Sequence, residues 1–223
     1  MSFEFHEDEH MFLLDGKRLP SVTELLGPLQ EESFKAIAPS VLKAAADRGT
    51  AVHEICEAMD YDLDYEDLIV PDLVPFVDAY DDFLMDHDVE WLGIETPVHF
   101  FEQYAGIVDR FGYIDGKPAV LDIKTVQSPT IEQKVAVSCQ LYAYDRAIKA
   151  CFNCFDRPAE HYALYLKKDG SYKLFDCREF AAKDDFEPSA IWTDLWNAYE
   201  FKRLAQTRLA NVKEKHKRKK GDQ

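Results

Sequence analysis

The sequence lacks any apolar run long enough to cross a bilayer, which needs about 20 consecutive apolar residues. Its first ten residues lack the basic segment and the apolar core of a secretory signal peptide. Basic residues are also scarce, because 26 Lys and Arg stand against 42 Asp and Glu, for a net charge of −16. These shortages exclude a membrane-spanning protein and a simple DNA-coating protein, which is basic overall. We expect a cytoplasmic protein.

Cysteine is likewise sparse and odd in number, which argues against a disulfide framework in an intracellular chain. The five cysteines are Cys56, Cys139, Cys151, Cys154 and Cys177. What is present is ordinary for a globular protein: 47% hydrophobic and 30% charged residues in 223 residues. That length suits one domain. We therefore expect a single domain over residues 1–212 with a core at about 41–178, followed by a basic, disordered tail at 213–223.

Charge is unevenly distributed along the chain. No Lys or Arg occurs between Arg48 and Arg110, whereas the residues from Lys202 to Gln223 hold nine Lys and Arg against two acids. A basic end on an acidic body favours a local contact with a polyanion. The alternative is an ordinary solvated terminus. The acids of residues 60–90 are most simply the solvated side of a helix and its entry loop, and screening of DNA or partner binding are alternatives.

Hydrophobic periodicity predicts a mixed α/β protein. Asp15-Gly16 and Asp115-Gly116 are turn signals between short apolar runs, and Ser21 with Glu24 forms a capping box for a helix. Further helices are expected at 41–59, 73–84, 131–150 and 191–212, and strands at 91–101, 104–114, 119–123, 162–167 and 172–177. This order of elements fits a mixed central β-sheet flanked by helices.

The candidate catalytic residues lie on the predicted hairpin around Asp115-Gly116. With a two-residue loop, facing residues have numbers that sum to 231, so Asp109 faces Asp122 with the side chains about 5 Å apart at their base. Lys124 is two residues further and points to the same side. Facing carboxylates in an apolar sheet repel unless a cation offsets them, and a lysine beside a metal-bound water can orient it or help take its proton. The alternative is a wet sheet edge at which Lys124 simply pairs with one aspartate.

Four motifs in order resemble those of the PD-(D/E)XK nuclease superfamily, and in particular its RecB-like exonuclease branch. They are Arg48-Gly49-x-x-x-His53, Gly106-Ile-Val-Asp109, Asp122-Ile-Lys124 and Gln140-x-x-x-Tyr144. They span nearly half of the chain, and the opening Leu-Pro-Ser-Val-Thr-Glu-Leu-Leu also resembles phage-encoded members. The proline of the family name is absent, because Val108 precedes Asp109.

The resemblance implies a restriction-endonuclease-like core, with N-terminal helices and a C-terminal helix around it. It implies Mg²⁺ or Mn²⁺ bound by His53, Asp109, Asp122 and the Ile123 backbone carbonyl, with Lys124 acting on the attacking water. Asp109, Asp122 and Lys124 are thus the expected catalytic residues. Gln140 and Tyr144 would position the substrate strand or steady the site, and Arg48 is a further candidate for substrate binding.

Two more acids are candidates for the metal site. Glu57 lies four residues after His53 and so on the same helix face. Glu95 lies on the preceding strand, with Glu102 as the competing choice, and all three acids are alternatively surface residues. Gly49, one turn before His53, permits close approach of backbone or ligand.

Two other patterns are set aside. His6-Glu-Asp-Glu-His10 matches the zinc-protease motif, but no apolar helical face surrounds it and a third ligand is missing. Some RecB-like relatives carry an iron–sulfur cluster on one cysteine before the nuclease core and three after it. This chain lacks the clustered trio, so no cluster is expected, and Cys151 and Cys154 are read as packed thiols.

The leading hypothesis is a divalent-metal-dependent DNA exonuclease that leaves 5′-phosphates on linear DNA ends, in phage or prophage recombination or DNA end processing. Its expected location is the cytoplasm of a bacterial or phage-infected cell, with a recombination protein as a candidate partner. One alternative is a catalytically silent nuclease fold that binds nucleic acid or protein. Another is an acidic DNA mimic. Oligomeric state, polarity of digestion and strand preference are left open.

Overall fold

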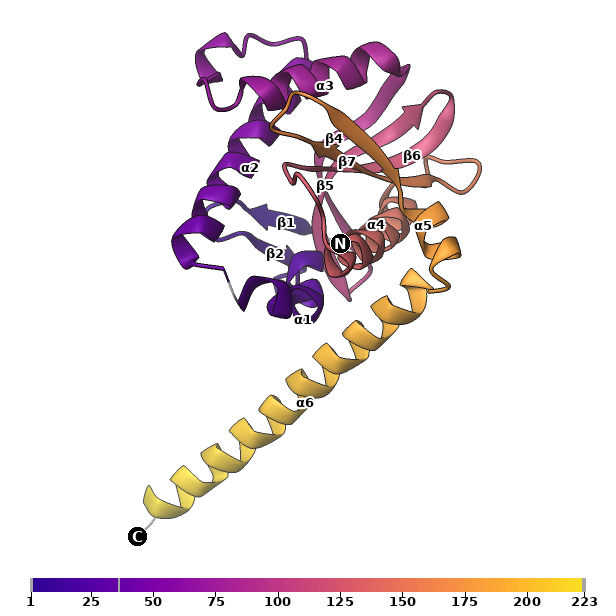
Figure 1. Cartoon of the computed structure of the whole chain (residues 1–223). Coiled ribbons are helices and arrows are strands. Elements are labelled where there is room, and N and C mark those ends of the chain that lie inside the picture. The colour runs from indigo at the N-terminus through magenta and orange to yellow at the C-terminus, as the bar shows by residue number, and fades with distance from the viewer. Residues whose placement is uncertain (1, 36, 222–223) are drawn as a thin grey trace.

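The computed structural model describes residues 2–35 and 37–221 (Figure 1). At its centre is a five-stranded sheet in the order β4-β5-β6-β7-β8. The strands are β4 (Val89–Phe100), β5 (Tyr104–Ile114), β6 (Lys117–Lys124), β7 (Glu160–Leu166) and β8 (Tyr172–Asp176). The sheet is mixed, because β6 and β7 are parallel and all other neighbours are antiparallel. The expected mixed α/β architecture is confirmed.

Helices cover both faces of this sheet (Figure 1). On one face, α2 (Pro39–Asp60) and α3 (Val74–Asp86) pack against side chains that include Leu121 and Ile123. On the other face, α1 (Val22–Lys35), α4 (Ile131–Cys151) and the start of α6 (Pro188–Gly221) pack against side chains that include Val120. The alternation of Val120, Leu121 and Ile123 between the two cores is the two-residue period of a strand buried on both sides.

The β5–β6 hairpin has the predicted register. Ile114 pairs with Lys117 and Arg110 with Leu121, so paired residues have numbers that sum to 231. Asp115 and Gly116 both have positive φ, at 51° and 70°, as a two-residue primed turn requires. Because β6 is followed by α4 and then by β7 parallel to it, one end of the hairpin lies beside α4.

The N-terminal region forms a second, small sheet of β1 (Phe3–His6), β2 (Met11–Leu14) and β3 (Lys17–Leu19). Asp15-Gly16 is the β2–β3 turn, as predicted, whereas β1 was not anticipated. His6 ends β1 and His10 lies in the turn that follows, so the zinc-protease pattern has no helix to present it. Ser21 caps α1 as expected, since its Oγ accepts from the Glu24 N–H at 2.9 Å.

Two C-terminal features differ from expectation. A short helix, α5 (Cys177–Lys183), follows β8, and Asp176 caps it. The final helix α6 runs from Pro188 to Gly221, so residues 213–221 are helical rather than a disordered tail. The reason is local composition, because Lys, Arg and Glu favour helix and neither glycine nor proline interrupts the segment before Gly221.

Residues 61–73 connect α2 to α3 and are named here the acidic segment, which includes the short 3₁₀-helix η1 (Glu66–Leu68). The five cysteines are free thiols, and Cys56, Cys139 and Cys177 are buried. Within the described residues, no helix combines the length and apolar character that a membrane crossing needs.

Candidate metal centre

Asp109 lies where β5 and β6 stop pairing. The pairing ends at Arg110 and Leu121, one step before the predicted Asp109–Asp122 pair. There the Ile123 N–H donates to Asp109 Oδ2 at 2.7 Å, so a carboxylate replaces a backbone carbonyl as the acceptor. Asp109 is 8% exposed, and this hydrogen bond fixes its carboxylate where the pairing of β5 with β6 ends. Asp109 thus lies at the end of the hairpin that the register predicts, but it does not form the predicted strand pair with Asp122.

His53 and Glu95 converge on this carboxylate from α2 and β4. His53 Nδ1 lies 3.2 Å from Glu95 Oε1, and Nε2 lies 3.0 Å from the Ile123 carbonyl oxygen and 3.7 Å from Asp109 Oδ2. One ligand atom from each of His53, Glu95 and Asp109 lies within 4.8 Å of the others. The structure therefore brings together four candidate metal ligands, namely these three side chains and the Ile123 carbonyl oxygen.

Glu95 reaches the site through an unusual backbone conformation. Its neighbours pair regularly, Ile94 with Arg110 and Thr96 with Val108, but Glu95 itself has a φ of +40°. A non-glycine residue in the left-handed region of a strand costs about 1–3 kcal/mol, and such positions cluster at functional sites. The competing candidate, Glu102, is exposed in the turn after β4. The structure therefore selects Glu95 between the two acids.

Asp122 forms a separate arm of the site with Lys124 and Gln140. Lys124 Nζ lies 2.8 Å from Asp122 Oδ1 and 2.7 Å from Oδ2, and Gln140 Nε2 donates to Oδ1 at 2.8 Å. The carboxylate is 1% exposed, whereas the Lys124 side chain is 35% exposed. Asp122 is not a member of the three-residue donor group, so its ligation of a metal stays a prediction.

The protonation of these groups reflects a crowded negative site. Burial disfavours a charged His53, but the nearby Asp109 and the hydrogen bond that His53 donates to Glu95 outweigh it and raise the pKa of His53 to about 9. Burial raises the pKa of Asp122 to about 6, and the Asp109 charge adds to this effect. Burial opposes the charge of Lys124, but Asp122 and Asp109 outweigh it and raise its pKa. Without a metal, bound protons on His53 and Lys124 balance the carboxylates.

A buried ion network of Arg110, Asp60 and Glu95 holds Glu95 in place, and the sequence analysis did not predict it. The Arg110 side chain is 0% exposed, and Nε donates to Asp60 while Nη1 donates to Glu95 Oε1 at 3.1 Å. Asp60 also accepts from the Tyr80 hydroxyl at 2.9 Å and from Trp91 Nε1 at 3.0 Å. The available signal was Arg110 itself, a lone base inside an apolar strand, which needs a buried acid as its partner.

Tyr144 steadies the site through packing. It is 4% exposed and stacks on the backbone of Gly106, where an added Cβ would lie 2.7 Å from Tyr144 Cε1. The glycine of the Gly106-Ile-Val-Asp109 motif is therefore required for this close approach. Glu57 is half-buried on α2 and lies outside the three-residue donor group.

A cavity of about 460 Å³ opens beside the site between α2 and α4. Its polar lining includes Arg48, His53, Lys124 and Gln140, and its apolar wall includes Val41, Leu42, Ala45, Ala46, Val126 and Val137. Arg48 stacks over the Phe76 ring, and its buried Nε has no hydrogen-bond partner within residues 2–35 and 37–221. The predicted substrate-binding residues Arg48 and Gln140 thus share one cavity with Lys124.

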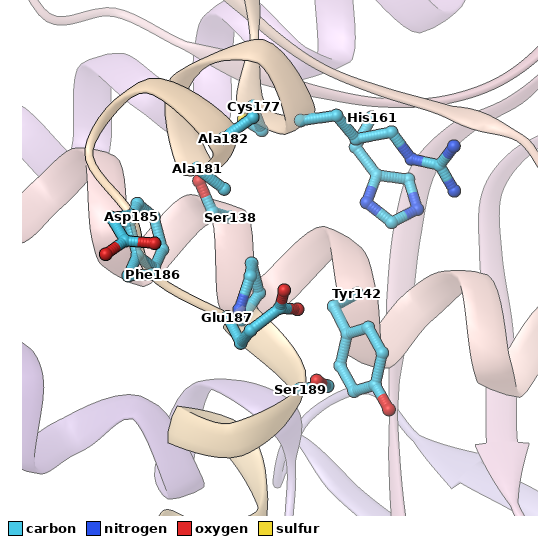
Figure 2. Close-up of a pocket in the computed structure, with 12 residues that line it drawn as sticks. Ser138, Tyr142, His161, Cys177, Ala181, Ala182, Asp185, Phe186, Glu187 and Ser189 are labelled. Atoms are coloured by element: carbon cyan, nitrogen blue, oxygen red, sulfur yellow. The ribbon is translucent and has the colours of Figure 1, made fainter.

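A second cavity, of about 320 Å³, lies among α4, α5 and the start of α6 (Figure 2). From α4 it takes Ser138 and Tyr142, which are offset by two residues from Gln140 and Tyr144 and therefore lie on another helix face. His161, which also lines it, lies 3.5 Å from the buried Asp145. This cavity is distinct from the candidate metal centre.

Comparisons with known proteins add little to this geometry. No family model matches the chain, and no curated protein matches it. A solved structure titled "Crystal structure of SSO0001" is similar over 77% of this chain and 82% of its own, at 14% identity and a TM-score of 0.28. The function must therefore be argued from the site.

Proposed function

We propose that the chain is a divalent-metal-dependent nuclease of the PD-(D/E)XK type that hydrolyses phosphodiester bonds in DNA. The observation that carries the proposal is the convergence of His53, Glu95 and Asp109 beside the Asp122–Lys124 pair. Action on linear ends, 5′-phosphate products and a role in phage recombination or end processing rest on the motif resemblance, as does the RecB-like assignment.

The donor set fits Mg²⁺ or Mn²⁺. Carboxylate and carbonyl oxygens suit these hard cations, and one imidazole is compatible with Mn²⁺. The raised pKa of His53, which burial opposes but Asp109 and Glu95 produce, indicates that the site attracts positive charge. A divalent cation held there would polarise a phosphate oxygen and lower the pKa of an attacking water.

The protein's own side chains supply positioning and charge. Lys124 is held by the buried Asp122 and reaches the cavity, where its ammonium can orient the water and contact a phosphate oxygen. Its raised pKa, for which Asp122 and Asp109 outweigh the opposing effect of burial, favours a hydrogen-bond donor over a proton acceptor. Gln140 fixes Asp122 from α4, and Arg48 lines the same cavity and adds a positive charge to it.

The test is a cleavage assay with end-labelled linear DNA and covalently closed circular DNA, in Mg²⁺, Mn²⁺ or EDTA. The informative variant is Lys124→Ala. Its matched control is Lys149→Ala, which also removes a lysine 2.7 Å from a buried aspartate, Asp145, but outside the site. We expect metal-dependent loss of linear DNA, reduced at least about 100-fold by Lys124→Ala, as for loss of a general acid–base or orienting group, and retained by Lys149→Ala.

The outcomes separate the candidate functions. Cleavage of the circle as well as the linear DNA keeps the site and makes the enzyme an endonuclease. Absence of cleavage by folded, metal-loaded protein refutes the nuclease proposal. Metal-independent DNA binding in that case would favour a silent binding module, and absence of both would favour an acidic partner-binding protein.

A further inference from the structure

The final helix leaves the body of the protein part-way along its length. Trp192 and Leu195, near its start, are buried, and this part of α6 packs with α1 and α4. From residue 201 onward the described side chains of α6 are exposed, and Figure 1 shows the helix continuing away from the sheet to its C-terminal end. At 1.5 Å per residue, residues 201–221 extend about 30 Å beyond the packed part.

The projecting part carries an apolar stripe, named here the α6 stripe. It consists of Phe201, Leu204, Leu209 and Val212, which are 77%, 46%, 54% and 63% exposed. Spacings of three, five and three residues keep these side chains within one broad helix face. A single helix of this length is marginally stable in water, and its usual stabilisation is the burial of an apolar face. The α6 stripe is thus a face built for packing.

The C-terminal part of α6 is strongly basic, and the acidic segment has the opposite charge. The residues from Lys202 to Gln223 hold nine Lys and Arg against two acids, and the acidic segment holds five acids and no base. The acidic segment also exposes large apolar side chains. They are Tyr61 at 53%, Leu63 at 59%, Leu68 at 46% and Val70 at 53%. Both surfaces therefore combine exposed apolar residues with a high charge of opposite sign.

We propose that the α6 stripe of one copy docks on the acidic segment of a second copy of this chain. The two surfaces lie at opposite ends of the molecule in Figure 1, with the acidic segment beside α3 and the end of α6 far below it, so the helix cannot fold back onto its own segment. A two-fold axis repeats the contact and closes a dimer. Apolar contacts supply affinity, and the opposite charges supply orientation and rate of encounter. Phosphates alone would need no apolar stripe, which is why a protein surface is favoured over DNA.

The test is sedimentation velocity of the full chain without DNA, over a concentration series in low and high salt. We expect self-association that weakens as salt rises. Leu209→Glu weakens it at least about tenfold, equivalent to about 1.4 kcal/mol. The control, Ala210→Glu, adds the same charge to another face of α6 and leaves association intact. Leu63→Lys in the acidic segment weakens association as much as Leu209→Glu.

Mixing the two weakened variants gives the decisive result. A Leu209→Glu chain keeps an intact acidic segment, and a Leu63→Lys chain keeps an intact α6 stripe, so an equimolar mixture rebuilds one of the two contacts and associates more than either alone. A monomer at every concentration refutes the proposal. A dimer that responds to Leu209→Glu but not to Leu63→Lys refutes it in favour of helix–helix pairing, and a monomer whose DNA affinity falls with Leu209→Glu refutes it in favour of DNA. None of these outcomes depends on nuclease activity.

Discussion

Addition of Mn²⁺ to metal-free protein should raise its thermal stability, because the cation replaces protons in balancing Glu95, Asp109 and Asp122. A ligand at about 100 times its Kd stabilises the folded state by about 2.7 kcal/mol. For a chain of this size each kcal/mol corresponds to about 2–4 °C, so the expected rise in melting temperature is about 5–10 °C. The measurement is thermal unfolding in Mn²⁺ or EDTA, at pH 6 and at pH 9.

The dependence on pH follows from His53. Burial opposes its charge, but Asp109 and Glu95 raise its folded pKa from 6.5 to about 9. The bound proton therefore stabilises the metal-free protein by at most about 3 kcal/mol below pH 6.5, and this is lost as pH rises through about 9. Burial also raises the pKa of Asp122 from 3.8 to about 6, so a proton bound there likewise stabilises the metal-free protein at low pH. This contribution is lost as pH rises through about 6. A metal needs neutral imidazole, so its stabilising effect is larger at pH 9 than at pH 6.

Two matched variants decide whether the effect belongs to this site. Asp109 lies 3.7 Å from His53, and Asp145 lies 3.5 Å from His161, and both acids are buried. Asp109→Asn should abolish most of the rise caused by Mn²⁺, whereas Asp145→Asn should keep it. The reasoning is refuted if wild-type protein shows no rise, if the rise is larger at pH 6, or if both variants behave alike.

Two further predictions concern the support of the site. Asp60→Ala should lower the free energy of unfolding in urea by about 3–5 kcal/mol, because it removes the buried carboxylate that pairs with Arg110 and leaves the partly exposed Glu95 as the acid beside a buried guanidinium. Asp47→Ala, which breaks the exposed pair with Lys43, should cost under about 1 kcal/mol. Gly106→Ala should displace Tyr144 and lower the rate of DNA cleavage while the fold persists; near-ultraviolet circular dichroism and the cleavage assay measure these, and unchanged activity would contradict the packing argument.

The sequence was most informative where local rules apply. Asp115-Gly116 favours a two-residue turn, and the structure has the register that follows from such a turn, with paired residue numbers that sum to 231. Periodicity likewise located α2, α3 and α4, since each has a long apolar face. These elements could be predicted because their signals lie within a few neighbouring residues.

The remaining parts depend on contacts between distant segments. The choice of Glu95 over Glu102 follows from a left-handed backbone in β4, which no residue pattern signals. The Asp60–Arg110 pair joins a helix end to a strand, and a single sequence gives no measure of that proximity. The dense positive charge of residues 213–221 favours a disordered tail, whereas the high helix propensity of Lys, Arg and Glu favours the helix that the structure has there.

The contacts that close the site span very different lengths of chain. His53 meets the Ile123 carbonyl across 70 residues and Asp60 meets Arg110 across 50, whereas the β5–β6 hairpin closes through a two-residue turn. Long loops close more slowly than short ones, so the hairpin can form well before α2 docks on it. During refolding, metal affinity should therefore rise later than strand content. If the protein binds metal as proposed, metal capture is a late marker of the native state.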